Sequence, residues 1–427
     1  MATLKEIFRE FQPTEALKAG NPRYVDTLSA RGIENLRTTL VFQATAGGSP
    51  VILFAGSVGD GKTTLLNQLT LDLQAEGAFV VYLDATNYFK PDIAPHDLLP
   101  AILEAVMTKL PEAFPGQRGV WDQLLASWKG FWAELRHLGT LPVELEGIEA
   151  ALPGGVSLVA KLRTRDNAQA QLRQVLQRAN EDTLLNLVNR LLASAQQLLD
   201  QHQRGRLVVL LDALDRVFAG EATLARDEAL FVSGAPFLSR VEVAVVYTAR
   251  SNFVNQHYQN LGILYGTTPF VLPQVLVRKR NGEPNPEALA VLRRLVERRL
   301  EAAGATLEEV FGPGPGGTDR LNRLCLQSGG HMRNLLLLMQ NALGAARGQL
   351  PLTDEGIRRG IGAIAAPTAL SAGSFRRHLE RVRETGSLDE VPQEERSHFL
   401  DFWYVYRYRE DEHDWYGVNP LCIRDAP

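Results

Sequence analysis

The amino-acid sequence predicts an α/β fold in which helices cover both faces of a parallel sheet. Apolar runs at 51–55, 79–84 and 205–212 have the length of buried strands, and helical periodicity follows each of them. Strands that alternate with helices pair in parallel, because each helix returns the chain to the same edge of the sheet. Two further strands are expected at 241–250 and 269–273.

Composition places the chain among globular proteins of more than one domain. It has 427 residues, of which 45% are hydrophobic and 22% are charged, so two or three domains are expected. The formal net charge of −4 gives no global basic field for nucleic acid. Cys325 and Cys422 match no metal or disulfide spacing, and no apolar run is long enough for a signal core or a membrane span. We therefore expect a soluble, cytoplasmic protein.

A glycine-rich loop follows the strand at 51–55 and leads directly into a helix at 62–75. Its pattern, Gly-x-x-x-x-Gly-Lys-Thr, is that of a phosphate-binding P-loop in the strand–loop–helix context that this loop requires. Backbone N–H groups would surround the phosphates, Lys62 would reach the β- and γ-phosphates, and the Thr63 hydroxyl would bind Mg²⁺. The pattern predicts ATP binding by Gly56, Ser57, Val58, Gly59, Asp60, Gly61, Lys62, Thr63 and Thr64.

Two acids follow the strand at 205–212. Asp212 ends that strand, where the second acid of a P-loop site belongs, and it would hold Mg²⁺ through water. Asp215 either orients the attacking water or complements the dipole of a helix N-terminus, and both alternatives stay open. The usual second acid directly after the first is replaced by Ala213, which predicts slow hydrolysis.

Polar residues at the end of one further strand and near the start of one helix complete the predicted site. Thr248 and Arg250 end the strand at 241–250 and are expected to face the phosphates, although Arg250 could equally form a surface ion pair. Arg333 follows the glycine pair in Ser-Gly-Gly-His-Met-Arg, near a helix start. It would either reach the nucleotide from a second domain or be an ordinary exposed arginine.

The segment 97–203 reads as almost entirely helical, and 115–165 is interpreted as a helical insertion in the core domain. Trp121, Trp128 and Trp132 lie in it. These tryptophans could form a binding platform, but their helical spacing favours burial.

The pattern changes again towards the C-terminus. Helices at 286–303 and 332–347 are separated by the loop Gly-Pro-Gly-Pro-Gly-Gly at 312–317. β-Forming residues on both sides of a charged turn predict a hairpin at 402–418. The predicted domains are an ATPase core at 1–280, a helical lid at 281–368 and a C-terminal domain at 369–427.

Together these segments resemble an AAA+-type P-loop ATPase, and most of all the bacterial origin-recognition-complex-like ATPases near the STAND and KAP groups. The resemblance implies an N-terminal segment near the adenine with Arg31 as a contact, Thr248 or Arg250 as sensor 1, and Arg333 as sensor 2 on the lid. It also implies a winged-helix-like C-terminal domain. It rests on the P-loop and on the segments 24–32, 210–216, 247–250, 328–333 and 415–420.

The sequence therefore predicts an ATP-binding, Mg²⁺-dependent ATPase that acts as a conformational switch, with a protein partner or self-association and without a membrane. One alternative is a DNA-acting loader that uses Arg407 and Arg409 of the hairpin, although the net charge and the acidic turn at 410–414 argue against it. Another is a slowly hydrolysing scaffold of the STAND kind in bacterial defence or signalling, whose insertion binds an effector.

Overall fold

A computed structural model describes the chain except for residues 1, 90–92, 139–180, 218–222, 347 and 424–427. The chain divides into two compact units. One comprises Met1–Arg37, Gly56–Gln68 and Val271–Pro427, and we call it the lid unit. The other comprises Thr38–Ala55 and Leu69–Phe270, and we call it the sheet unit. None of the described helices is long and apolar enough to cross a membrane.

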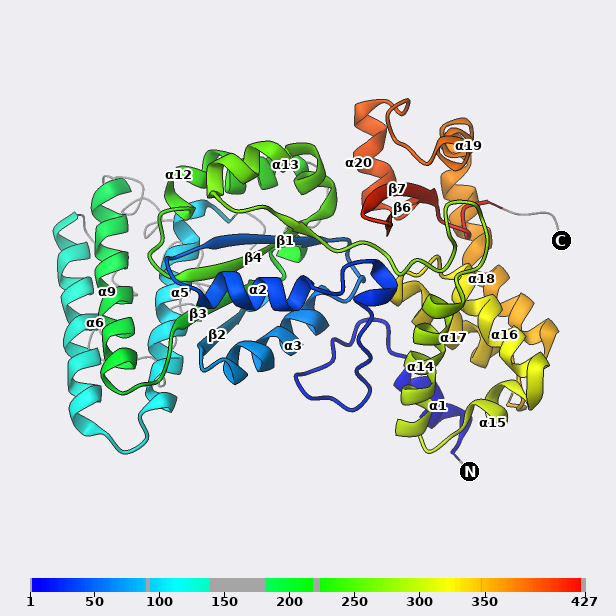
Figure 1. Ribbon diagram of the computed structural model, residues 1–427, viewed down its shortest axis with the longest axis horizontal. Helices are drawn as coiled ribbons and strands as arrows, with labels where there is room; N and C mark the ends of the chain where they lie inside the picture. The colour runs from blue at the N-terminus through cyan, green and yellow to red at the C-terminus, as the bar shows by residue number, and fades with distance from the viewer. Residues whose placement is uncertain (1, 90–92, 139–180, 218–222, 347, 424–427) are drawn as a thin grey trace. The chain divides into compact units, whose positions relative to one another are not determined.

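The sheet unit is built on a five-stranded sheet of order β2-β3-β4-β1-β5 (Figure 1). The α/β fold predicted from the sequence is therefore confirmed. β2 pairs in parallel with β3, and β3 with β4. Every residue of β1 and β3 is buried, which explains their continuous apolar runs. The strands are β1 Val51–Gly56, β2 Phe79–Asp84, β3 Leu207–Asp212, β4 Ala244–Arg250 and β5 Phe270–Val271.

Helices pack on this sheet, α5 against β2, α9 against β3 and α13 against β4. The P-loop helix α3, Lys62–Ala75, has the predicted bounds and runs from the lid unit into the sheet unit. The remaining helices of this part are α2 Leu36–Thr45, α4 Ala85–Tyr88, α5 Pro95–Lys109, η2 Leu110–Ala113, α6 Arg118–Leu138, α9 Glu181–Gln201, α10 Leu214–Val217, α11 Thr223–Glu228, the π-helical turn η5 Ala229–Ser233, α12 Ala235–Leu238 and α13 Ser251–Tyr265.

The tryptophans of the predicted insertion belong to a helix pair. α6 packs against α9, and Figure 1 shows the two side by side. Trp128 and Trp132 are each only 1% exposed, and their rings meet edge to face with centroids 5.6 Å apart. These two aromatics are therefore core residues and not a binding platform. Residues 139–180, which include much of the predicted insertion, lie outside the described part of the chain.

The lid unit contains a helical part with its own apolar core. Buried leucines of three helices, α14, α16 and α17, contribute to this core, and α1 packs on α14 and α17. The helices are α1 Leu4–Glu10, η1 Ser29–Arg31, α14 Pro286–Ala302, α15 Leu307–Phe311, α16 Gly314–Gln327, α17 Met332–Ala345 and α18 Asp354–Ala372.

The glycine- and proline-rich segment at 312–317 is not the loop that its composition predicts. α16 begins within it, at Gly314. Proline is favoured in a first helical turn because its missing N–H has no partner there in any case. A Cβ on Gly317 would lie 2.0 Å from the carbonyl oxygen of Gly312, so this glycine permits a close approach of the backbone.

The C-terminal part of the lid unit carries the predicted hairpin. β6 Val405–Glu410 pairs antiparallel with β7 His413–Val418, and the two-residue turn between them has positive φ at both positions. The helices η6 Gly373–Phe375, α19 Arg376–Thr385 and α20 Gln393–Asp401 precede it. Successive helices followed by a hairpin are consistent with a winged-helix-like arrangement.

Candidate nucleotide-binding site

The loop between β1 and α3 has the backbone shape of a phosphate-binding loop. Gly59 and Gly61 have φ of +98° and +95°, conformations that L side chains rarely adopt. The loop leads directly into the N-terminus of α3 at Lys62, and the positive end of a helix dipole favours an anion. The glycines of the sequence pattern are therefore required by the backbone that the loop adopts.

The Lys62 ammonium lies over the loop itself. Its Nζ donates hydrogen bonds to the carbonyl oxygens of Gly56 (2.7 Å) and Ser57 (2.9 Å). Thr64, two positions on, accepts a hydrogen bond from the Leu17 backbone N–H (3.2 Å), which links the N-terminal segment to the P-loop helix.

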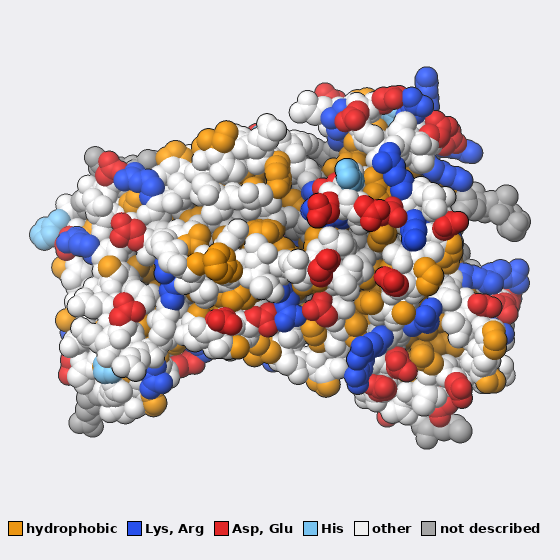
Figure 2. All heavy atoms as spheres, in the orientation of Figure 1, with side chains coloured by type: hydrophobic (Ala, Val, Ile, Leu, Met, Phe, Trp, Pro, Cys, Tyr) orange, Lys and Arg blue, Asp and Glu red, His pale blue; other side chains and the backbone are white. Residues whose placement is uncertain are grey.

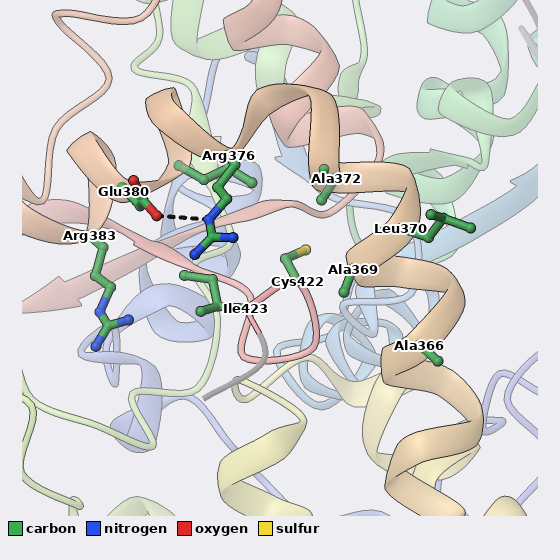
Figure 3. A pocket seen from close by; sticks show the side chains of 11 residues that line it. Ala366, Ala369, Leu370, Ala372, Arg376, Glu380, Arg383, Cys422 and Ile423 are labelled. Carbon is green, nitrogen blue, oxygen red and sulfur yellow. Dashed lines mark hydrogen bonds and ion pairs between the residues drawn. The ribbon is translucent and has the colours of Figure 1, made fainter. Parts of the chain in front are cut away.

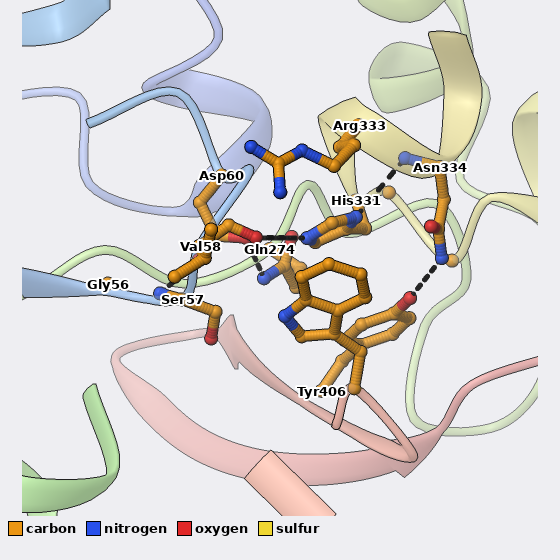
Figure 4. Close-up of polar contacts among 12 residues, drawn as sticks. Gly56, Ser57, Val58, Asp60, Gln274, His331, Arg333, Asn334 and Tyr406 are labelled. Atoms are coloured by element: carbon orange, nitrogen blue, oxygen red, sulfur yellow. Dashed lines mark hydrogen bonds and ion pairs between the residues drawn. The ribbon is translucent and has the colours of Figure 1, made fainter. Parts of the chain in front are cut away.

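The side chain of Asp60, inside the loop, is 1% exposed and points into a polar cluster (Figure 4). Its Oδ2 accepts from the Ser57 N–H at 2.6 Å, and its Oδ1 accepts from Gln274 Nε2 at 2.6 Å. His331 Nε2 is 3.3 Å from the same Oδ1. The Asp60 carboxylate therefore connects the loop to two segments that are more than two hundred residues away in the sequence.

His331 is the N-cap of α17, and its ring nitrogens have distinct partners. Nδ1 accepts from the Asn334 N–H (3.2 Å), so the proton of the neutral ring is on Nε2, which faces the Val58 carbonyl oxygen at 3.2 Å. Burial lowers the pKa of His331 to about 4, although Asp60 acts in the opposite direction. The ring is therefore neutral at pH 7. It stacks on Tyr406 of β6, with centroids 5.5 Å apart and planes 7° from parallel.

Arg333 lies against the P-loop, in the same unit. Its backbone N–H donates to the Gly59 carbonyl oxygen (3.2 Å), and its side-chain Nε donates to the Pro13 carbonyl oxygen (3.3 Å). The guanidinium carbon is 5.7 Å from the centre of the Trp403 ring. These contacts place the arginine beside the loop, and its predicted role as a sensor of the nucleotide stays a prediction.

Arg31 is also beside the loop, and it is only 2% exposed. Its guanidinium donates to the carbonyl oxygens of Asp60 (2.8 Å) and Pro273, and its Nε donates to the Thr27 hydroxyl (3.0 Å). Burial lowers its pKa to about 10, which leaves it charged at pH 7. Arg31 therefore stabilises the loop through hydrogen bonds to backbone carbonyl oxygens. Its predicted contact with the adenine stays a prediction.

In the sheet unit, Asp212 ends β3 with its carboxylate held on both sides. Tyr82 donates its hydroxyl to Oδ2 at 2.6 Å, and the Ala213 N–H donates to Oδ1 at 2.6 Å. Ala213 has φ of +63°, an unfavourable conformation for a residue with a side chain. Burial, followed by the Asp212 charge, raises the pKa of Tyr82, so the phenol stays a hydrogen-bond donor.

The other predicted residues of the sheet unit lie at the ends of neighbouring elements. The buried Thr248 accepts from the Leu214 N–H at 3.2 Å and connects β4 to α10. Asp215 is 5% exposed on α10. Arg250 Nε lies 3.4 Å from the carboxylate of the buried Asp227, so its ion pair is not the surface pair that was the alternative. The catalytic roles of Asp215, Thr248 and Arg250 stay predictions.

Sequence reasoning missed Gln274, Tyr406 and Tyr82. Gln274 and Tyr406 meet the loop only through the tertiary fold, and no local pattern marks them. Tyr82 lies two positions before the end of an apolar strand, and its polar hydroxyl was the available signal. His331 lies within the Gly-Gly-His-Met-Arg segment, of which only the arginine was predicted to be a site residue.

The donor set is compatible with Mg²⁺. The described residues contain no group of three or more histidine, cysteine or acidic side chains that could hold a metal ion. Mg²⁺ does not need such a group, because it usually binds one or two protein oxygens together with waters and substrate phosphates. The carboxylate of Asp212 and the hydroxyl of Thr63 each supply an oxygen of this type, and their role as metal ligands stays a prediction.

A separate pocket of about 490 Å³ lies between α18, α19 and the C-terminal segment (Figure 3). Alanines and Leu370 line it together with Arg376 and Arg383, and Arg376 pairs with Glu380 at 2.9 Å. Burial raises the pKa of the Cys422 thiol in this pocket to about 12. The thiol is therefore protonated at pH 7 and supplies no nucleophile.

No family model and no curated protein matches this chain. Among solved structures, it is similar to the Walker-type ATPase PABY2304 of Pyrococcus abyssi, with 12% identity, 97% and 98% of the two chains covered, and a TM-score of 0.42. It is similar to Cdc6p of Pyrobaculum aerophilum, with 14% identity, 97% and 94% coverage and a TM-score of 0.39. It is also similar to the ADP form of the ORC2 protein of Aeropyrum pernix, with 15% identity, 97% and 93% coverage and a TM-score of 0.38. Each of these scores is below 0.5, whereas the sheet order and the P-loop themselves identify the fold.

Proposed function

We propose that this protein binds ATP with Mg²⁺ and hydrolyses it as a conformational switch of the AAA+ type. The observation that carries the proposal is the loop from Gly56 to Lys62, with two left-handed glycines at the start of a helix and a lysine ammonium at its centre. This arrangement of backbone donors and one cation is complementary to the phosphates of a nucleotide.

The proposed site divides into residues that bind the phosphates and residues that bind the metal ion. Lys62 and the loop N–H groups would bind the phosphates, and Thr63 and Asp212 stay the predicted metal ligands. Bound Mg²⁺ would neutralise charge on the β- and γ-phosphates. Tyr82 and the Ala213 N–H support this role for Asp212, because they fix the orientation of its carboxylate.

The contacts of Asp60, His331 and Arg333 support a switch. They join the P-loop to the start of α17 and to β6, all within the lid unit. A loop that changes on nucleotide binding would alter these contacts and so reposition the hairpin and its neighbours. The output would be a protein contact, either with a partner or with a second copy of the chain, and a role in defence or signalling fits such an output.

The charges of the C-terminal part do not favour duplex DNA as the ligand. α20 carries Glu394, Glu395 and Asp401, and charges of both signs alternate over this region on the face shown in Figure 2. Of Arg407 and Arg409, the two basic residues of the predicted DNA contact, Arg407 is paired with Asp414 across the hairpin. A DNA-binding surface would present a field of one sign.

The test compares Lys62→Ala with Lys18→Ala, which removes an exposed lysine of the same unit. Binding of a fluorescent ATP analogue and steady-state phosphate release are measured with and without duplex DNA. We expect Lys62→Ala alone to lose both activities, and we expect no effect of DNA. Unchanged binding and turnover in Lys62→Ala would refute the nucleotide site. Stimulation by DNA that weakens with salt would favour the loader alternative.

A further inference from the structure

Three consecutive carbonyl oxygens of the P-loop, at positions 58–60, receive hydrogen bonds from outside the loop, all within the lid unit. The pairs are His331 Nε2 with Val58 (3.2 Å), the Arg333 N–H with Gly59 (3.2 Å) and the Arg31 guanidinium with Asp60 (2.8 Å). A loop that binds phosphate through its N–H groups has its carbonyl groups turned elsewhere, where they need donors of their own. The lid unit supplies these donors.

The ring of His331 lies between the loop and the start of α17, and all of its polar atoms are engaged (Figure 4). Nδ1 accepts from the Asn334 N–H, Nε2 faces the Val58 carbonyl oxygen, and the ring stacks on Tyr406. The side chain is 0% exposed, so water does not replace it as the donor to Val58. The position of the Val58 carbonyl group is therefore coupled to the position of the α17 N-terminus.

The start of α17 also packs directly on the loop. A Cβ on Gly59 would lie 2.8 Å from Arg333 Cβ and 3.0 Å from His331 Cε1. The loop has no room to move towards α17, and a movement away from it would break the hydrogen bonds to Val58 and Gly59. The conformation of the loop therefore depends on the start of α17.

We propose that His331 is a positioning residue of the ATP site, an inference that rests on the ATP binding proposed above. Its Nε2–H holds the Val58 carbonyl oxygen, so the N–H groups of the loop are already arranged for phosphate before ATP arrives. A loop arranged in advance binds its ligand more tightly, because binding does not have to order it. His331 acts through the loop and not on the nucleotide.

A purely structural role determines the choice of variants, because His331 is also the N-cap of α17. The two ring nitrogens allow the roles to be separated. The side-chain oxygen of asparagine is as many bonds from Cβ as Nδ1, so His331→Asn keeps the cap and loses the donor to Val58. The glutamine Nε2 is as many bonds from Cβ as the ring Nε2, so His331→Gln keeps that donor. Both variants lose the stacked ring.

The experiment measures the affinity of the full chain and its variants for a fluorescent, non-hydrolysable ATP analogue with Mg²⁺, together with Tm. We expect about tenfold weaker binding in His331→Asn, the order of change that one lost hydrogen bond produces, and a change of less than about twofold in His331→Gln. Thr353→Ala is the matched control, because Thr353 caps another helix of the same unit, α18, through the Gly356 N–H (3.1 Å). It should lower Tm and leave the affinity unchanged.

Hydrogen exchange in the unchanged chain keeps the test decisive if a variant folds poorly. Coupling between two sites is reciprocal, so a helix start that favours ATP binding is itself stabilised by bound ATP. We expect the ATP analogue to slow exchange at the Asn334 N–H more than at the Gly356 N–H of the α18 cap.

Equal affinities in His331→Asn and His331→Gln, or weaker binding in the glutamine variant, would overturn the inference. Equal effects of the analogue on exchange at the two caps would overturn it as well. The failure of the proposed function is distinguishable, because it would appear as Lys62→Ala retaining ATP binding and turnover.

Discussion

Replacing Asp60 tests whether the polar cluster of Figure 4 stabilises the lid unit. In Asp60→Ala the part-buried Ser57 N–H and the buried Gln274 amide each lose an acceptor. Asp60→Asn keeps one oxygen and replaces the other with an amide that donates. Gln274 Oε1 has no hydrogen-bond partner among the described residues, so rotation of its amide group would provide an acceptor for the new donor. Alanine should therefore be the more damaging replacement.

The expected magnitudes follow from those contacts. A buried donor that loses its acceptor costs about 1–3 kcal/mol. The buried Gln274 amide at the middle of that range and the part-buried Ser57 N–H at its lower end together predict about 3 kcal/mol of lost stability in Asp60→Ala. Asp60→Asn, in which the Ser57 N–H and the new amide have acceptors and only the rotated Gln274 Nε2 loses one, should lose about 1 kcal/mol. For a folding unit of this size, 1 kcal/mol corresponds to about 2–4 °C in Tm, which predicts a decrease of about 6–12 °C for the alanine variant.

Thermal unfolding followed by circular dichroism and by intrinsic fluorescence would measure these shifts. Asp319→Ala is the control, because Asp319 is exposed on α16 of the same unit and should change stability by less than about 0.5 kcal/mol. If Asp60→Ala unfolds at the temperature of the unchanged chain, the cluster contributes nothing to the lid unit. If asparagine proves as damaging as alanine, the rotation of the Gln274 amide does not occur.

Two further predictions concern the same region. The pKa of His331 falls from 6.5 to about 4 on folding, so its contribution to stability is complete above pH 6.5 and is lost as the pH falls to about 4. The loss should amount to about 3 kcal/mol, and urea titrations at several pH values should show a flatter profile for His331→Gln. In Gly330→Ala the new Cβ would lie 1.9 Å from the Val275 carbonyl oxygen at φ of +75°, so about 2–5 kcal/mol should be lost. Gly344→Ala, in α17 with open space around it, should instead gain about 0.5–1 kcal/mol, and equal melting temperatures for the two variants would contradict this reasoning.

The sheet and the hairpin could be predicted because their information is local. A buried parallel strand is a short apolar run, and a hairpin is two β-forming segments around a polar turn. The loop predicted at 312–317 was wrong. The composition of this segment indicates a loop, whereas α16 begins at Gly314 and Gly317 packs closely against Gly312. Tertiary contacts therefore outweighed the low helix propensity of the glycines and prolines at the start of α16.

In the candidate site, too, some residues can be predicted from local sequence and others only from the tertiary fold. The loop glycines and Lys62 follow from spacing alone, since their chemistry depends on consecutive residues. His331 was visible in the sequence near Arg333, but its place against the loop requires the tertiary fold. Gln274 could not be identified at all, because it contacts the loop across 214 positions of sequence.

Asp60 presents an apparent conflict, since a carboxylate inside a loop that binds phosphate should repel the ligand. The structure resolves it through the direction of the side chain, which points to the Gln274 amide and the His331 ring (Figure 4). The neutral His331 ring donates without adding a charge, and Arg31 brings a compensating cation to the backbone of the same residue. Asp60 therefore links the loop to Gln274 and His331 in the rest of the lid unit and does not face the phosphate position. A loop fastened in this way cannot change shape without changing those contacts, and this coupling is the physical basis of the proposed switch.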